Sequence, residues 1–293
     1  MTIISFAVAL VGFVIFAPVL GCLLAGVDRI VSARLQGRVG PVLLQPYYDV
    51  RKLLAKENRS VNGYQEFYIV LSLAFAILSG VFFFAGGNFL LVLFVLTLSS
   101  LFFIIAAYSA RSPYADAGAQ REIIQIASYE PMTILLCVTF FMATNTFNVS
   151  EVFNRDLPLV ATLPLVFAAF LFILTIKLRK SPFDLSYSHH AHQELVKGIT
   201  TEMSGRTLAL VEITHWYESI LFMGWVALFF IWNTMLAIPV VIIAVLLIYF
   251  LEVFIDNTFA RVKWQAMLFW SWTVTIICCL LNIIYLIVLG YLG

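Results

Sequence analysis

The part of the chain that decides both its fold and its chemistry is residues 177–218, which read KLRKSPFDLSYSHHAHQELVKGITTEMSGRTLALVEITHWYE. The first part of this segment is rich in charged and polar side chains, and long apolar runs lie on both sides of the segment. In its last part, Glu212, His215 and Glu218 stand among apolar residues. At about 100° per residue, these three side chains fall within one third of a helix circumference. The segment therefore predicts a polar loop followed by a helix that carries a buried polar stripe.

The composition predicts an integral membrane protein. Of the 293 residues, 62% are hydrophobic and only 11% are charged, and the mean hydropathy is +1.01. A soluble domain of this length would carry about twice as many charged residues. The formal net charge of +1 by itself argues neither for nor against a nucleic-acid partner, because the positions of the charges matter. We expect one integral membrane domain over residues 1–293 and no nucleic-acid partner.

The apolar runs predict an all-α polytopic fold of about eight transmembrane helices. A span needs about 20 consecutive, mostly apolar residues. The candidate spans are residues 3–27, 67–86, 88–108, 123–147, 158–176, 207–232, 235–255 and 266–291. An even number of spans leaves both termini on the same side.

The basic residues predict the orientation. All but Arg155 of the 17 Lys and Arg residues fall in the connections after the first, third, fifth and seventh spans. Because basic residues concentrate in cytoplasmic loops, these four connections are expected to be cytoplasmic. Both termini are then expected to lie outside.

The first basic connection contains a predicted interfacial helix after Pro46. Its apolar side carries Tyr47, Val50, Leu53 and Leu54, and its charged side carries Asp49, Lys52 and Lys56. Such an amphipathic segment is typical of a helix that lies in the plane of the membrane surface. It could act as a surface anchor or frame an opening into the membrane interior.

The fourth predicted span carries a second polar face, formed by Glu122, Gln125, Tyr129 and Glu130. Glu122 fits either a first-turn carboxylate favoured by the helix dipole or a member of a charge pathway. Pro131 has no amide hydrogen, so the carbonyl oxygen of Ala127 needs another donor. Glu130 lies deeper, where a carboxylate usually marks a path for ions or protons.

Each of the other polar groups has a structural alternative. Glu212, His215 and Glu218 could form a hydrogen-bonded cluster that holds helices together, but we favour proton transfer because neighbouring titratable groups have coupled proton affinities. Glu194 and Glu202 could be solvated surface groups, although their apolar neighbours suggest that the loop folds back on the protein.

No metal site is expected in this chain. His189, His190 and His192 lack a cysteine partner nearby, so we interpret them as hydrogen-bonding groups or proton relays. The four cysteines lie in apolar runs without metal-binding spacing and are expected to be core residues. Any metal centre would therefore belong to another chain.

Two sets of motifs carry a family resemblance. The first loop contains Arg34-Leu-Gln-Gly-Arg38-Val-Gly40-Pro41, then Asp49 and Lys52-Leu53; the third contains Pro182-Phe183-Asp184, Gln193-Glu194-Leu195 and Glu202-Met203-Ser204-Gly205. These motifs resemble those of the membrane subunit shared by respiratory complex I and membrane-bound nickel–iron hydrogenases, the subunit that docks the peripheral redox arm. The resemblance covers nearly the whole chain.

Several departures favour the hydrogenase branch. Arg121-Glu122, Glu130-Pro131 and the run from Asp256 to Arg261 are similar to that branch, and the histidine-bearing loop is most similar to Ech-type energy-converting hydrogenases. The resemblance implies a subunit in a prokaryotic plasma membrane that holds no cofactor itself. The nickel–iron site and the iron–sulfur clusters are then expected on partner subunits.

The resemblance implies a role for each polar group. Partner docking is expected at Arg34, Arg38, Asp49 and Lys52; loop coupling at Asp184, His189, His190 and His192; and the proton or ion pathway at Glu122, Glu130, Glu194, Glu202, Glu212, His215 and Glu218. The expected partners are a hydrogenase large subunit, an iron–sulfur small subunit, an antiporter-like membrane subunit, ferredoxin indirectly, and the lipid bilayer.

Three alternatives stay open at this point. The chain could form the quinone site of a complex I type NADH dehydrogenase. It could be a free-standing ion transporter or channel, or it could belong to a formate-coupled hydrogenase.

Overall fold

The apolar sequence folds entirely into helices and connecting loops, since helices satisfy backbone amides and carbonyls within one segment. The structure is a computed structural model, and it describes residues 3–57, 62–180, 182–188 and 193–292. The described elements are α1 (Ile3–Leu35), α2 (Gln45–Ala55), α3 (Gly63–Phe84), α4 (Phe89–Tyr108), α5 (Pro113–Thr144), η1 (Val149–Asn154), α6 (Leu159–Thr162), α7 (Pro164–Lys177), η2 (Gly198–Thr200), α8 (Arg206–Phe230), α9 (Ala237–Thr258) and α10 (Trp264–Leu292). The predicted all-α class is confirmed.

Six of the described helices are long and apolar enough to cross a membrane, namely α1, α3, α4, α5, α9 and α10. Each of the other two predicted spans differs from an uninterrupted apolar helix. Residues 158–176 form two helices, because the chain turns between Leu163 and Pro164, and α7 has only 14 residues. Helix α8 has 25 residues, but the polar stripe with Glu212, His215 and Glu218 interrupts its apolar sequence.

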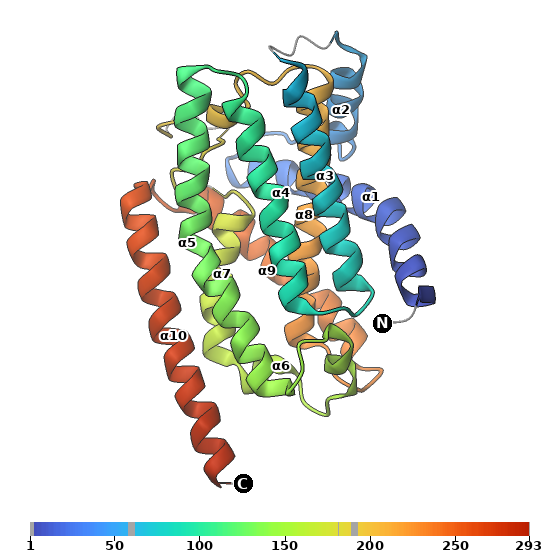
Figure 1. Cartoon of the computed structure of the whole chain (residues 1–293), viewed down its shortest axis with the longest axis vertical. Helices are drawn as coiled ribbons and strands as arrows, with labels where there is room; N and C mark the ends of the chain where they lie inside the picture. Colours follow the sequence, from blue (N-terminus) through green and yellow to red (C-terminus); the bar gives the residue numbers. More distant parts are fainter. Residues whose placement is uncertain (1–2, 58–61, 181, 189–192, 293) are drawn as a thin grey trace.

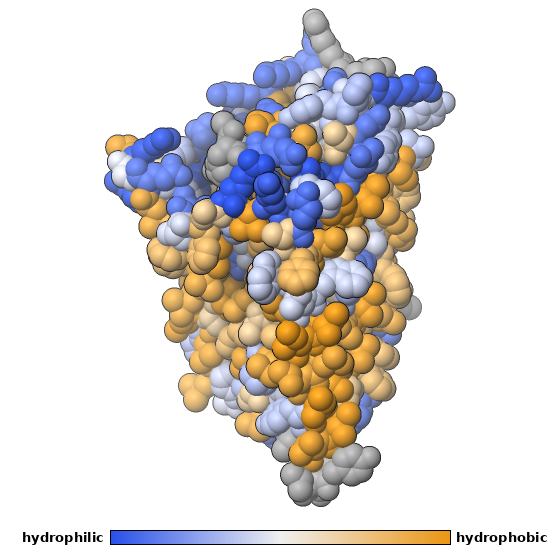
Figure 2. Space-filling model, turned by 90° about the vertical axis from the view of Figure 1, so that its left-hand side faces the viewer, coloured by the Kyte–Doolittle hydropathy of each residue, from blue (hydrophilic) through white to orange (hydrophobic). Residues whose placement is uncertain are grey.

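The basic connections gather at one end of the bundle. Figure 1 shows α2, the α4–α5 connection and the loop before α8 at the upper end of the molecule, and both chain termini in the lower half. Hydrophilic side chains cover this upper end, whereas most of the visible face below it is apolar (Figure 2). The charge asymmetry along the sequence is therefore an asymmetry in space.

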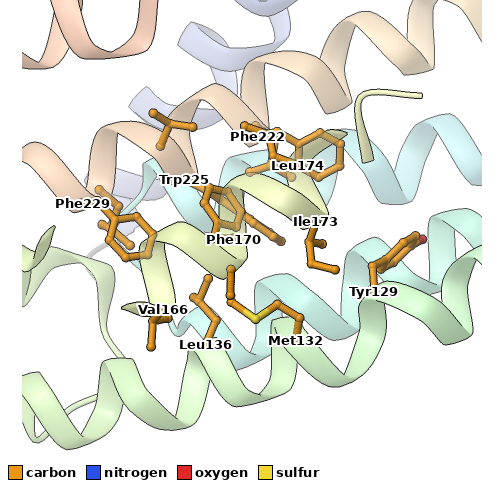
Figure 3. Packing of buried hydrophobic residues seen from close by; sticks show 14 of the residues in the cluster. Tyr129, Met132, Leu136, Val166, Phe170, Ile173, Leu174, Phe222, Trp225 and Phe229 are labelled. Atoms are coloured by element: carbon orange, nitrogen blue, oxygen red, sulfur yellow. The ribbon is translucent and has the colours of Figure 1, made fainter. Parts of the chain in front are cut away.

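Helix α7 lies at the centre of the apolar core. Its side chains pack against α8, where the rings of Phe170 and Phe229 stack with centroids 5.7 Å apart. Trp225, also on α8, is 1% exposed, and its ring centroid lies 5.6 Å from the ring centroid of Phe222. Figure 3 shows these residues between α5 and α8. Because α7 is short, its last residues lie within the bundle and do not reach the ends of the neighbouring helices.

The carbonyl of Ala127, which lacks a donor because of Pro131, accepts a hydrogen bond from another helix. The indole Nε1 of Trp272, on α10, donates a hydrogen bond of 2.9 Å to the carbonyl oxygen of Ala127. The carbonyl oxygen that lacks the amide of Pro131 thus accepts a hydrogen bond from a side chain. This hydrogen bond also fixes α10 against α5.

The loop between α7 and α8 folds back onto the bundle. Arg261 donates two hydrogen bonds to the carboxylate of Asp184, at 2.7 and 2.9 Å. The backbone amide of Asp184 also donates to the carbonyl of Val262 at 3.1 Å. Residues 183–188 are consequently buried, although they belong to a loop. Three predicted site residues, His189, His190 and His192, lie outside the described residues.

A glycine sets how closely this loop approaches α5. A Cβ atom on Gly118 would lie 2.2 Å from the amide nitrogen of Ile199. We expect Gly118→Ala to lower the stability of the protein by about 1–3 kcal/mol, because the loop backbone must move. Thermal melting of the purified protein in mild detergent measures this loss. The control is Gly12→Ala on α1, where no atom lies within 4 Å; equal melting temperatures for both variants would contradict the close packing.

Candidate functional site

A polar cavity of about 450 Å³ opens at the basic end of the bundle. Helices α1, α8 and α9 and the loop after α7 contribute its walls. Its charged and polar lining residues are Asp28, Arg29, Ser32, Arg179, Lys180, Tyr187, Ser188, Gln193, Glu212, His215 and Asp256. The cavity therefore brings together residues that lie far apart in the sequence.

Glu122 forms the most buried ion pair at this site. Its side chain is 2% exposed, and it accepts two hydrogen bonds from Arg179, at 3.0 and 3.3 Å. The hydroxyl of Ser186 donates a further hydrogen bond to the same carboxylate. Helix α5 begins at Pro113, so Glu122 is far beyond the first turn, and the alternative of a dipole-favoured carboxylate at the helix start is wrong.

The next loop residue contacts a second carboxylate. The phenol of Tyr187 donates a hydrogen bond of 2.8 Å to Glu212 on α8. Burial, followed by the negative charge of Glu212, raises the pKa of Tyr187, so the phenol stays a donor. The ring of His215 lies beside it, with centroids 5.8 Å apart. Consecutive residues of one loop thus hold carboxylates on two different helices.

Two smaller cavities continue from this point into the bundle. One, of about 10 Å³, is lined by Ser72, Ser100, Arg179, His215 and Glu218 together with apolar residues. The other, of about 20 Å³, has Glu122, Tyr129, Lys177, Arg179 and Glu218 among its lining residues. A water molecule needs roughly 10–15 Å³ of such space. Because neighbouring cavities share His215, Arg179 and Glu218, the polar groups form a continuous series.

Lys177, which the sequence places only among the cations of a basic loop, is also a member of this series. Its ammonium lies 3.9 Å from the ring centroid of Tyr129, 5.1 Å from Phe222 and 5.4 Å from Trp225. Aromatic faces attract a cation electrostatically, and this effect grows when water is excluded. Its charge also interacts with Glu130 and Glu218. The amine is therefore coupled electrostatically to one carboxylate on α5 and to one on α8.

Glu130 lies further along α5, on the side of α4. Thr97, on α4, donates a hydrogen bond of 2.5 Å to its carboxylate. The side chain of Glu130 is partly exposed, whereas Glu122 is buried. Glu130 does not line the two smaller cavities; its connection to the series is the electrostatic interaction with Lys177.

Three predicted site residues lie away from the large cavity. Glu194 is 51% exposed and pairs with Arg121 at 2.9 Å, which is the surface alternative considered for it. Glu202 is partly buried in the same loop and does not line the cavity within the described part of the chain. Asp184 is bound to Arg261 and fixes the loop rather than facing the cavity.

The predicted docking residues of the first loop differ in their surroundings. Arg34 and Arg38 are exposed around the end of α1. Asp49 accepts hydrogen bonds from Arg29 at 2.6 Å and from Gln45 at 2.9 Å. Burial opposes ionisation of Asp49, but these hydrogen bonds outweigh it and lower the pKa of its carboxyl group.

A second group of acids, missed from the sequence, surrounds Lys180. Its ammonium bonds to Asp28 on α1 and lies 3.7 Å from Asp256 on α9. One turn along α9, Glu252 is fully buried, and neither of its oxygens has a hydrogen-bond donor among the described residues. The neighbouring Thr175 donates instead to the carbonyl of Leu171, at 3.3 Å. The signal in the sequence that could have identified Glu252 is an acidic residue within an apolar run.

The described residues contain no group of three or more His, Cys, Asp or Glu side chains with metal-binding geometry. The arrangement instead supplies carboxylates, hydroxyls and an imidazole in sequence, which suits proton movement.

Known proteins are similar to this chain in sequence and in fold. A sequence profile of the family described as NADH dehydrogenase matches residues 7–287. The chain belongs to this family.

Members of the NADH dehydrogenase family with different names are similar to the chain. Hydrogenase-4 component C of Escherichia coli is 29% identical over 82% of this chain and 83% of its own length. NADH-ubiquinone oxidoreductase chain 1 of Mycosarcoma maydis is 28% identical over 84% of this chain and 84% of its own length. Formate hydrogenlyase subunit 4 of Escherichia coli is 32% identical over 62% and 64%, respectively.

A solved structure shares the fold of this NADH dehydrogenase family member. A chain of the membrane-bound sulfane sulfur reductase, an archaeal respiratory membrane complex, has a TM-score of 0.84 and 23% identity. The similarity covers 97% of this chain and 100% of that one.

The buried ion pair predicts a large effect on stability. We expect Arg179→Met to destabilise the complex by about 3–5 kcal/mol, because the charge of Glu122 would remain buried without a partner. Thermal melting in mild detergent measures the loss. Arg206→Met is the control, because the pair of Arg206 with Glu66 is largely exposed and should contribute at most about 1 kcal/mol. Similar losses in both variants would contradict the buried pair.

Proposed function

We propose that this chain is the docking and ion-coupling membrane subunit of a ferredoxin-linked, energy-converting nickel–iron hydrogenase. Membership of the NADH dehydrogenase family makes it a membrane component related to complex I. Two relatives are named hydrogenase-4 component C and formate hydrogenlyase subunit 4. These names, with the sequence departures toward the hydrogenase branch, support the hydrogenase assignment.

The observation that carries the coupling role is the contact of two consecutive loop residues with two membrane carboxylates. Ser186 bonds to Glu122 on α5, and Tyr187 bonds to Glu212 on α8. A redox partner seated on the loop can thus change the surroundings of both acids by a small movement. Each lost hydrogen bond to a carboxylate makes the charged form less favourable.

In this proposal the chain's own residues move the charge. Glu212 and His215 exchange protons at the large cavity, and Glu218 receives them beside Arg179 and Lys177. Glu130, at the far end of the series, faces antiporter-like partner subunits. The cofactors belong to the proposed large subunit and iron–sulfur small subunit, and ferredoxin reaches the complex only through them.

The proposed topology follows the charge asymmetry. The hydrophilic end with the first, third, fifth and seventh connections faces the cytoplasm, where the redox partners dock. Helices α7 and α8 complete an eight-span bundle with the six apolar helices, so both termini lie outside. Arg34 and Arg38 are exposed at this end and are available to a partner.

Quinone reduction is the second candidate. Relatives named as components of NADH-quinone oxidoreductase are 27% and 28% identical to this chain, and Arg29 of the large cavity bonds to Asp49 on α2. Purification in mild detergent discriminates the candidates. Nickel and iron in the copurifying set support the hydrogenase, whereas inhibition of turnover by quinone-site blockers supports the alternative. Isolation of an active chain by itself would support a free-standing carrier.

Removal of an acid from the series should uncouple ion movement. We expect Glu218→Gln, and likewise Glu212→Gln, to reduce the ions moved per hydrogen formed at least threefold while hydrogen formation with soluble electron donors continues. Ion uptake and hydrogen formation are measured together in inverted vesicles. Glu151→Gln serves as control, since Glu151 lies on η1 outside the bundle and bonds to Asn154. Unchanged coupling in both acid variants would refute this pathway.

The loop contact predicts a milder and more specific defect. Tyr187→Phe removes the donor to Glu212 but keeps the ring, so coupling should fall while the complex stays assembled. The same vesicle assay provides the readout. Tyr114→Phe is the matched control, because its hydroxyl bonds to the backbone carbonyl of Val196 on the same loop, at 3.0 Å. Equal coupling in the two variants would show that the loop transmits nothing through Tyr187.

A further inference from the structure

A groove of about 290 Å³ lies between α1, α2 and α8, beside the large cavity. The two share Ala25, Arg29 and Glu212 among their lining residues. The volume is at the small end of the range for small-molecule sites, about 300–1,000 Å³. The groove therefore forms a lateral approach to the polar interior.

Three lysines gather at this groove. Lys52 and Lys56 come from α2, and Lys197 comes from the loop before α8. None of the three has an ion pair with a carboxylate within the described residues. Cations held close together repel one another, so an anion between them would be stabilised.

The two acids that line the groove are already bound to other side chains. Asp49 pairs with Arg29 at 2.6 Å. Glu212 accepts the hydrogen bond of 2.8 Å from Tyr187. The cationic side chains of the groove, Arg29 and the three lysines, outnumber its two carboxylates, so an excess of positive charge is left for a ligand from outside the chain.

The floor of the groove is apolar. Val50 and Leu53 of α2 and Leu208 and Trp216 of α8 line it below the lysines. Trp216 is only 8% exposed. A soluble anion gains nothing from such a surface, whereas an amphiphile with an anionic head matches both parts.

The position of α2 indicates where this amphiphile comes from. Outside the groove, the same helix exposes Tyr47 and Leu54, each 51% exposed, and the turn before it exposes Val42 to 66%. Apolar side chains beside lysines are typical of a helix at the boundary between lipid tails and headgroups. Basic pockets at this depth bind acidic lipid headgroups.

We propose that an anionic phospholipid occupies this groove. Its phosphate binds among Lys52, Lys56 and Lys197, and its acyl chain lies against Leu53 and Trp216. The bound lipid closes the lateral approach to the cavity. A quinone ring offers the three lysines only uncharged carbonyl acceptors, whereas a phosphate also balances their charge, so the groove favours the acidic lipid. This inference does not depend on the identity of the redox partners.

Lipid retention tests the proposal directly. The complete complex is exchanged into nanodiscs of phosphatidylglycerol or phosphatidylcholine, transferred to detergent, and examined by native mass spectrometry for lipid that stays bound. We expect phosphatidylglycerol to be retained and phosphatidylcholine to be lost. Lys52→Gln/Lys56→Gln/Lys197→Gln should weaken retention about 100-fold, since each lysine near an anionic headgroup contributes roughly fivefold.

The charge-matched control is Arg51→Gln/Arg111→Gln/Lys263→Gln, which removes three exposed cations outside this groove. It should keep full retention, and both triple variants should melt within a few degrees of the parent. Equal loss of lipid in the control would reduce the effect to general surface charge and overturn the proposal. Equal retention of both lipids by the parent complex would also overturn it.

Two further outcomes identify other occupants. Release of the lipid by millimolar inorganic phosphate alone would reveal a free-anion site, and its release by a water-soluble quinone would reveal a quinone site; either result would overturn the lipid assignment. Lysine acetylation separates lipid from protein: Lys52, Lys56 and Lys197 should be protected in phosphatidylglycerol nanodiscs but not in phosphatidylcholine. Protection in both would mean that a partner protein covers the lysines, and it would refute the lipid assignment.

Discussion

The ion pair between Glu122 and Arg179 is the constraint on which the rest of this structure depends. Two unpaired charges at this depth would be costly, so the protein must bring the cation of one segment to the acid of another. The pair forms only because the loop after α7 folds down between α5 and α8. The clamp of Arg261 on Asp184 and the close approach at Gly118 both hold the loop in that place. Packing and charge pairing thus support one arrangement.

The short helix α7 makes this arrangement possible. Its 14 residues rise about 21 Å, less than the roughly 30 Å of a bilayer core. The chain therefore reaches the loop while still inside the bundle, and Lys177, Arg179 and Lys180 end up between helices. A full-length apolar helix would carry these cations to the surface. Buried loop residues 183–188 occupy the space that a longer helix would fill, and their polar groups lie inside the bundle.

The six long apolar helices and the carboxylates Glu122, Glu130, Glu212 and Glu218 could be identified from the sequence, whereas the cations that accompany them could not. Apolar runs mark helices, an acid within such a run is conspicuous, and Pro131 identified the carbonyl at Ala127. Lys177 and Arg179, however, follow an apolar run, where basic residues normally mark a cytoplasmic loop. Their orientation depends on where the chain breaks at Pro164, which is a tertiary effect. Glu252 could not be recognised because the predicted span ends at residue 255. Asp256, its neighbour one turn along α9, was therefore assigned to the following loop, and Glu252 had no second acid on its face to form a pattern.

Pairing divides the cations of this chain into two kinds with different uses. Arg179 and Arg261 are held by carboxylates, as is Lys180, so their charges are neutralised and their positions are fixed. Such groups respond to a displaced loop, because any movement breaks a pair in a medium of low dielectric constant. The lysines at the α2 groove have no such ion pairs within the described residues and remain available to an external anion. The interior can therefore transmit a movement, while the lateral groove can hold a ligand without disturbing that network.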